Sequence, residues 1–180
     1  FGGSVTIGLQ RLGVGNYGGG IYQTNTFCGL TGVKGNGVSY TTKMAGMDVK
    51  ILNAMGALEI DAVKVYGANV KTTMGGIPVA ANIVALSQNS NLGFAVEVEG
   101  MYEVSGLKLA AQYYMDLDNK IATLARARTQ KESFLAVYGD YGYGMGNVYL
   151  DYVMAMSDDT KTSWGNESEM KLGLSYDIDA

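Results

Sequence analysis

The stretch from residue 92 to residue 117 constrains the fold more than any other part of the chain. In its first half, Phe94 and Val98 belong to an apolar parity, whereas Glu97 and Glu99 belong to the other, largely polar parity. Side chains on a strand point alternately to opposite faces of a sheet, so this segment has one apolar face and one polar face. The alternation predicts a two-faced β-strand.

The second half of this stretch repeats the alternation after Ser105-Gly106, a two-residue turn sequence. Two alternating runs joined in this way predict a β-hairpin. Its strands are about 11 to 13 residues long, whereas strands of soluble proteins usually have about 5 to 6. A transmembrane β-strand needs about 9 to 11 residues. The length therefore favours a membrane barrel.

The rest of the chain continues the pattern, with short and long connections in alternation. We expect ten strands, near residues 4–12, 37–44, 47–53, 60–73, 77–87, 92–104, 107–117, 134–143, 147–156 and 170–179. The connections at 45–46, 75–76, 105–106 and 144–146 are short, whereas those at 13–36, 118–133 and 157–168 are long. This rhythm is typical of outer-membrane barrels. Two segments also fit helices: Val79–Gln88 as a short helix and Ile121–Lys131 as a helical turn.

Composition excludes several classes of protein. Charged residues make up 17% of the chain, and 26 glycines and 13 tyrosines accompany a single proline. The net charge of −4 provides no basic stripe for nucleic acid. The chain has no histidine, which excludes a Ser-His-Asp triad and a histidine-based zinc site. Cys28 is the single cysteine, so no disulfide can form within the chain.

Motifs that suggest chemistry have simpler explanations. Residues Gly13–Gly18 match G-x-G-x-x-G, but no helical pattern follows, as a dinucleotide site requires. Glu97 and Glu99 share a face, and a hydrated polar surface explains them better than glycosidase chemistry. Asp158-Asp159 is most simply a pair of solvated loop charges. We therefore expect no enzyme activity, no cofactor and no metal.

The polar parity is the candidate functional surface. In a barrel it would line a mildly acidic lumen, whereas in a soluble sandwich it would face bulk water. The predicted lumen-lining residues are Glu97, Glu99, Glu103, Lys108, Gln112, Asp116, Asp151, Lys171 and Asp177. Arg126 and Arg128 lie in a long connection and are candidates for a constriction loop.

The chain resembles porin-type outer-membrane barrels of Gram-negative bacteria. The residues that carry the resemblance are the hairpins at Ser105-Gly106 and Gly142–Asn147 and the final MKLGLSYDI. The stretches SVTIGLQRLGVGNYGGG, GVSYTTK and DAVKVYGANV are similar in style to the barrel part of S-layer-homology porins of the OmpM type. That resemblance implies a homotrimer in contact with outer-membrane lipid, with an N-terminal domain that anchors the membrane to the cell wall. The sequence shows neither the anchoring domain nor the terminal aromatic residue of that family. Two expectations therefore stand side by side: a fragment of a larger protein, or a complete barrel of about ten strands.

The sequence thus predicts one all-β domain over residues 1–180, an antiparallel up-and-down transmembrane barrel or a sector of a larger one. The expected function is passive diffusion of small polar solutes or ions across the bacterial outer membrane. The alternative is a structural surface protein without transport, either a filled barrel that serves as an anchor or adhesin, or a secreted β-sandwich of a surface layer.

Overall fold

The computed structural model describes residues 2–14, 34–55, 64–88, 91–117, 133–156 and 169–177. All the regular elements in these ranges are β-strands. The ten strands are β1 (Gly3–Arg11), β2 (Lys34–Met44), β3 (Met47–Met55), β4 (Lys64–Met74), β5 (Ile77–Gln88), β6 (Asn91–Val104), β7 (Leu107–Asp116), β8 (Ser133–Gly142), β9 (Gly146–Ala155) and β10 (Glu169–Tyr176). For the described residues, the prediction of an all-β fold with ten antiparallel strands is confirmed.

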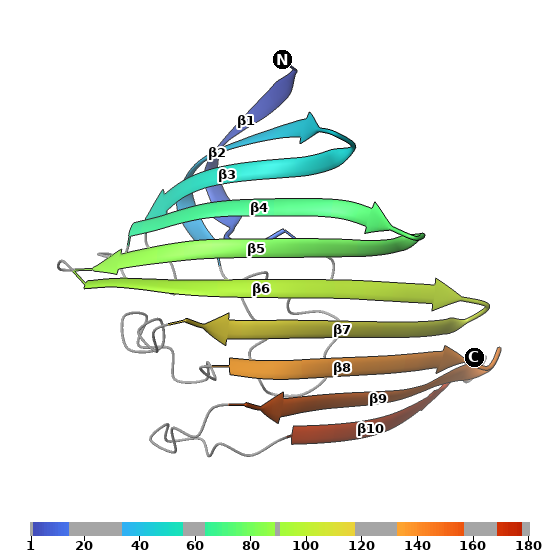
Figure 1. The fold of residues 1–180 in the computed structure, drawn as a ribbon. Coiled ribbons are helices and arrows are strands. Elements are labelled where there is room, and N and C mark those ends of the chain that lie inside the picture. The colour runs from blue at the N-terminus through green and yellow to red at the C-terminus, as the bar shows by residue number, and fades with distance from the viewer. Residues whose placement is uncertain are drawn as a thin grey trace.

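The strands form one antiparallel sheet in which each strand pairs with the next along the chain, from β1 to β10. Figure 1 shows this up-and-down order, with the short turns on the right. Within the described strands the sheet is open, because β1 and β10 are its two edges and do not pair with each other. The structure therefore shows the meander that was predicted but not its closure into a barrel.

Three of the short connections are two-residue turns with both central residues at positive φ. The φ angles are 50° and 80° at Ala45-Gly46, 59° and 85° at Gly75-Gly76, and 47° and 79° at Ser105-Gly106. Such type I′ turns match the twist of the strands they join. The predicted hairpin of residues 92–117 is confirmed, with Val104 opposite Leu107 next to the turn. These turns fix the register, and hence the face on which each side chain lies.

The two segments with a helical alternative have different outcomes. Val79–Gln88 is part of strand β5, with Pro78 one residue after its start, so the short-helix reading is wrong. Apolar β-branched residues such as Ile83 and Val84 favour a strand there. Ile121–Lys131 lies outside the described residues.

A glycine pair bends the sheet near its first edge. Gly8 of β1 has a φ of 117°, which L-residues rarely adopt, and it pairs with Gly37 of β2. A Cβ at Gly37 would overlap the carbonyl oxygen of Asn53 on β3. Glycine kinks of this kind introduce curvature into a sheet. In Figure 1, β1 and β2 accordingly turn away from the direction of the central strands.

Candidate functional site: the inner polar row

The two faces of the sheet differ in a way that is unusual for a soluble sheet, which buries its apolar side and exposes its polar side. We call the face that carries Glu97 the inner face and the opposite one the outer face. Polar side chains buried on the inner face are those of Gln10, Ser39, Asn69, Asn82, Glu97, Glu99, Gln112 and Asp151. Large apolar side chains exposed on the outer face include Ile7, Val38, Ile51, Ile83, Phe94, Val98, Leu109, Leu150 and Leu172.

The inner face is not uniformly polar. An apolar cluster that includes Leu52, Val84, Tyr114 and Phe134 occupies much of it. The rings of Tyr114 and Phe134 stack with their centroids 5.2 Å apart. Apolar and polar side chains together therefore fill this side of the sheet.

A row of polar residues crosses the centre of the inner face. Lys50 of β3 pairs with Asn69 of β4, Asn69 pairs with Asn82 of β5, and Asn82 pairs with Glu97 of β6. Directly opposed residues on neighbouring strands have Cβ atoms about 4.5 to 5.5 Å apart, so their side chains interact. We call these four residues the inner polar row.

Glu97 is completely buried, and amide groups hold both of its carboxylate oxygens. Asn82 Nδ2 donates to Oε1 at 2.8 Å, and Gln112 Nε2 donates to Oε2 at 2.9 Å. A buried carboxylate needs such donors because the loss of water is otherwise too costly. These hydrogen bonds connect β5, β6 and β7 across the inner face.

The last residue of β1 and the three residues after it lie across the inner polar row. Lys50 Nζ donates to the carbonyl oxygen of Arg11 at 2.7 Å, and Asn69 Nδ2 donates to that of Leu12 at 2.8 Å. Asn82 engages Val14 twice: its Oδ1 accepts from the Val14 N–H at 2.7 Å, and its Nδ2 donates to the Val14 carbonyl at 3.1 Å. We call residues 11–14 the strap.

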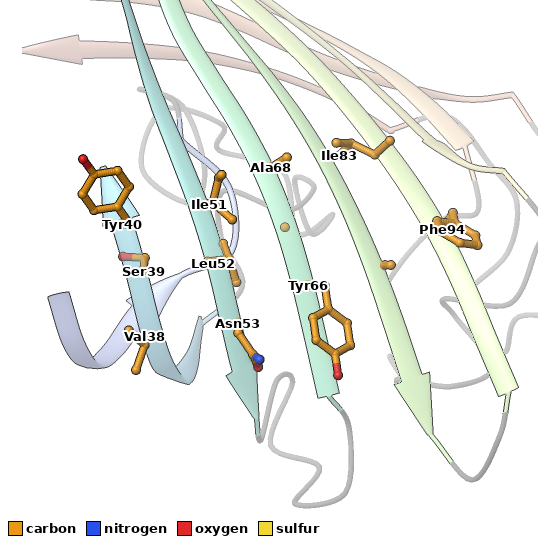
Figure 2. Close-up of a pocket in the computed structure, with 12 residues that line it drawn as sticks. Val38, Ser39, Tyr40, Ile51, Leu52, Asn53, Tyr66, Ala68, Ile83 and Phe94 are labelled. Atoms are coloured by element: carbon orange, nitrogen blue, oxygen red, sulfur yellow. The ribbon is translucent and has the colours of Figure 1, made fainter. Parts of the chain in front are cut away.

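The outer face has a hollow of about 560 Å³ over β2 to β6. Figure 2 shows the side chains around it, among them those of Tyr40, Ile51, Tyr66, Ile83 and Phe94. Larger residues form its walls, and the small side chain of Ala68 lies between them. The hollow is therefore an apolar surface feature, separate from the inner polar row.

The predicted lumen-lining residues occupy different environments. Glu97, Glu99, Gln112 and Asp151 are buried, Lys108 is partly buried, and Glu103, Lys171 and Asp177 are exposed. The side chain of Asp116 and all of Arg126 and Arg128 lie outside what the structure describes. Across the strands, Glu103 pairs with Lys108 and Asp151 pairs with Lys171.

Reasoning from the sequence missed the strap, together with its anchors Lys50, Asn69 and Asn82. A signal was present, because asparagine is depleted in strands and Asn69 and Asn82 stand in the middle of two predicted strands. Nothing in the sequence, however, indicates which backbone groups they bind.

No helix in the described ranges has the length and apolar character needed to cross a bilayer. Among the same residues, no group of three or more histidine, cysteine, aspartate or glutamate side chains is arranged to hold a metal ion.

The described part of the chain defines a class: an all-β fold built on a ten-stranded antiparallel meander, with a partly polar, buried inner face and an apolar, exposed outer face. Comparison with known proteins found no matching family model, curated protein or solved structure.

Proposed function

We propose that the sheet is the wall of a β-barrel in the bacterial outer membrane and that it passes small polar solutes or ions by passive diffusion. The exposure of apolar side chains on the outer face carries this proposal. Ile51, Ile83 and Val98 are 59%, 48% and 47% exposed although they lie in three different central strands. A contiguous apolar surface of this kind is costly in water and favourable in lipid.

Membrane insertion requires the sheet to close. Every backbone polar group in the hydrocarbon layer must be paired, because no water is available there. In this proposal the edges of β1 and β10 therefore pair with each other or with further strands. A closed barrel of ten strands has a narrow interior, whereas wide aqueous channels use about 16 to 18 strands.

The charge of the inner face favours cations. The polar parity carries Glu97, Glu99, Glu103 and Asp151. Acidic side chains that line a pore concentrate counter-ions and repel anions. Glu103 is exposed near a short turn, so it lies where ions would enter or leave.

A planar-bilayer measurement with a salt gradient tests this function. We expect a small, cation-preferring conductance that loses part of its preference in the Glu103→Gln variant. Absence of conductance in the unmodified protein would contradict the proposal. Anion preference that persists after both Arg126 and Arg128 are replaced by glutamine would also contradict it.

A specific observation favours a second candidate, a filled barrel with a structural role. Glu97, Gln112, Tyr114 and Asp151 are each 0% exposed, so the middle of the inner face is covered. A filled barrel would fold in lipid but conduct no ions. Detergent dependence separates both membrane functions from a secreted β-sandwich, which would stay soluble without detergent and show no heat-dependent shift on gels.

A further inference from the structure

The strap crosses three strands in step with the register of the sheet. Its backbone meets Lys50, Asn69 and Asn82, which oppose one another on β3, β4 and β5. Two spacings between neighbouring strands amount to about 10 Å, and three residues of extended chain reach about the same distance. The strap therefore runs nearly perpendicular to the strands, in an orientation that lets each strand contribute one anchor.

Asn82 makes the most hydrogen bonds of the three anchors, and both polar atoms of its side chain take part in them. Its oxygen accepts from the Val14 N–H, and its nitrogen donates to the Val14 carbonyl and to Glu97 Oε1. An amide side chain has two donor hydrogens, and these two bonds use both. Leu12 adds an apolar anchor, since it is 1% exposed and belongs to the buried cluster.

Glu97 holds Asn82 in this orientation from the other side. Its Oε1 takes one amide hydrogen of Asn82, while its Oε2 is held by Gln112. The carboxylate is therefore committed to hydrogen bonds inside the inner face. Its position beside the strap makes it part of the strap's support.

We infer that Asn69 and Asn82, oriented by Glu97, position residues 11–14 as an internal strap that sets the size limit for solutes passing along the inner face. The inference rests on the proposed function for its transport part, whereas the clamping itself does not depend on transport. The inference also gives the acidic residues two different roles. Glu97 supports the strap, whereas other carboxylates such as Glu103 contact the ions.

Hydrogen–deuterium exchange tests the clamp directly on the full chain folded in detergent micelles. The amide hydrogen of Val14 is bound to Asn82 Oδ1, so we expect it to exchange slowly in the unmodified protein. Asn82→Ala removes both contacts to Val14 and should accelerate exchange at Val14 by about tenfold or more. Asn69→Ala removes one anchor and serves as a second variant if Asn82→Ala does not fold.

Asn53→Ala is the matched control. Asn53 lies on β3, next to the strand β4 that carries Asn69, and its side chain is exposed on the outer face. It should leave exchange at Val14 unchanged. Unchanged protection of Val14 in folded Asn82→Ala or Asn69→Ala would overturn the clamp.

Vesicle uptake of neutral sugars of increasing size tests the transport part. We expect the Asn69→Ala and Asn82→Ala variants to admit larger sugars than the unmodified protein or the Asn53→Ala control. Faster exchange at Val14 without any change in the size limit would overturn the inference. An unmodified protein that admits nothing, together with an Asn82→Ala variant that admits sugars, would support the strap and contradict the open-pore function.

Discussion

Val98 and Glu97 are neighbours on β6, yet they face opposite environments. Val98 is 47% exposed on the outer face, whereas Glu97 is 0% exposed on the inner face. In a sheet with one face toward water, these positions would have the reverse accessibility. The contrast shows that one backbone presents an apolar surface to its surroundings and retains a hydrogen-bonded carboxylate inside. The proposal of a membrane barrel explains both faces with one arrangement.

Placing a charged side chain on the outer face should destabilise the protein more than any other change considered below. Val98 lies near the middle of β6, so in a barrel it would face the centre of the bilayer. Val98→Lys should lower the free energy of unfolding in lipid vesicles by about 2–4 kcal/mol, measured by denaturant titration. Val104→Lys, next to the turn at Ser105, is the matched control and should cost about 0–1 kcal/mol. Equal effects below about 0.5 kcal/mol at both positions would indicate a soluble sheet.

Removing the charge of the buried Glu97 carboxylate should have the next largest effect on stability. Glu97→Gln places an amide where two amide donors, from Asn82 and Gln112, now meet a carboxylate. The loss should lower stability by about 1.5–3 kcal/mol, the range for hydrogen bonds to a charged group. Glu103→Gln changes an exposed side chain on the same strand and face, so we expect a change within about 0.5 kcal/mol. Similar stabilities of the two variants would contradict a supporting role for Glu97.

Replacing alanine by the larger, uncharged leucine should lower stability on the inner face but not on the outer face. Ala95 is fully buried on the inner face, and Ala95→Leu should cost about 1–3 kcal/mol through overpacking. Ala68 is exposed on the outer face beside the hollow. Ala68→Leu should be tolerated in lipid, within about 0.5 kcal/mol. An equal cost at both positions in a denaturant titration would mean that the outer face is also tightly packed.

The strands and short turns could be predicted from the sequence because their causes are local. Alternation in residues 92–117 gives the two faces, and Ala45-Gly46, Gly75-Gly76 and Ser105-Gly106 have the composition of two-residue hairpin turns. The structure gives β4 as Lys64–Met74, and residues 60–63, where the pattern places its start, lie outside the described residues. A short apolar run can fit a helix or a strand, which explains why Val79–Gln88 also fitted a helix although the predicted strand at 77–87 is confirmed.

The inner polar row and the strap could not be predicted in the same way, because their causes are not local. Asn82 and Val14 are 68 positions apart. Only the register of β3 to β5 brings Lys50, Asn69 and Asn82 together under the strap. The pattern placed Glu97 on a polar face, but it did not reveal that two amides occupy its oxygens. Lengths and spacings along the chain do not encode such contacts.

The smallest expected effect on stability concerns the turns, which set the register of the strands and hence the face on which each side chain lies. Ala45 has a φ of 50°, a conformation that is strained for an L-residue and free for glycine. Ala45→Gly should therefore raise the free energy of unfolding by about 0.5 kcal/mol, because the relief of strain exceeds the entropy that glycine adds to the unfolded chain. Ala81→Gly makes the same change inside β5 and should lower stability by about 0.5–1 kcal/mol. Denaturant titration of both variants measures the difference, and a loss of stability in Ala45→Gly equal to that in Ala81→Gly would contradict the turn as a determinant of register.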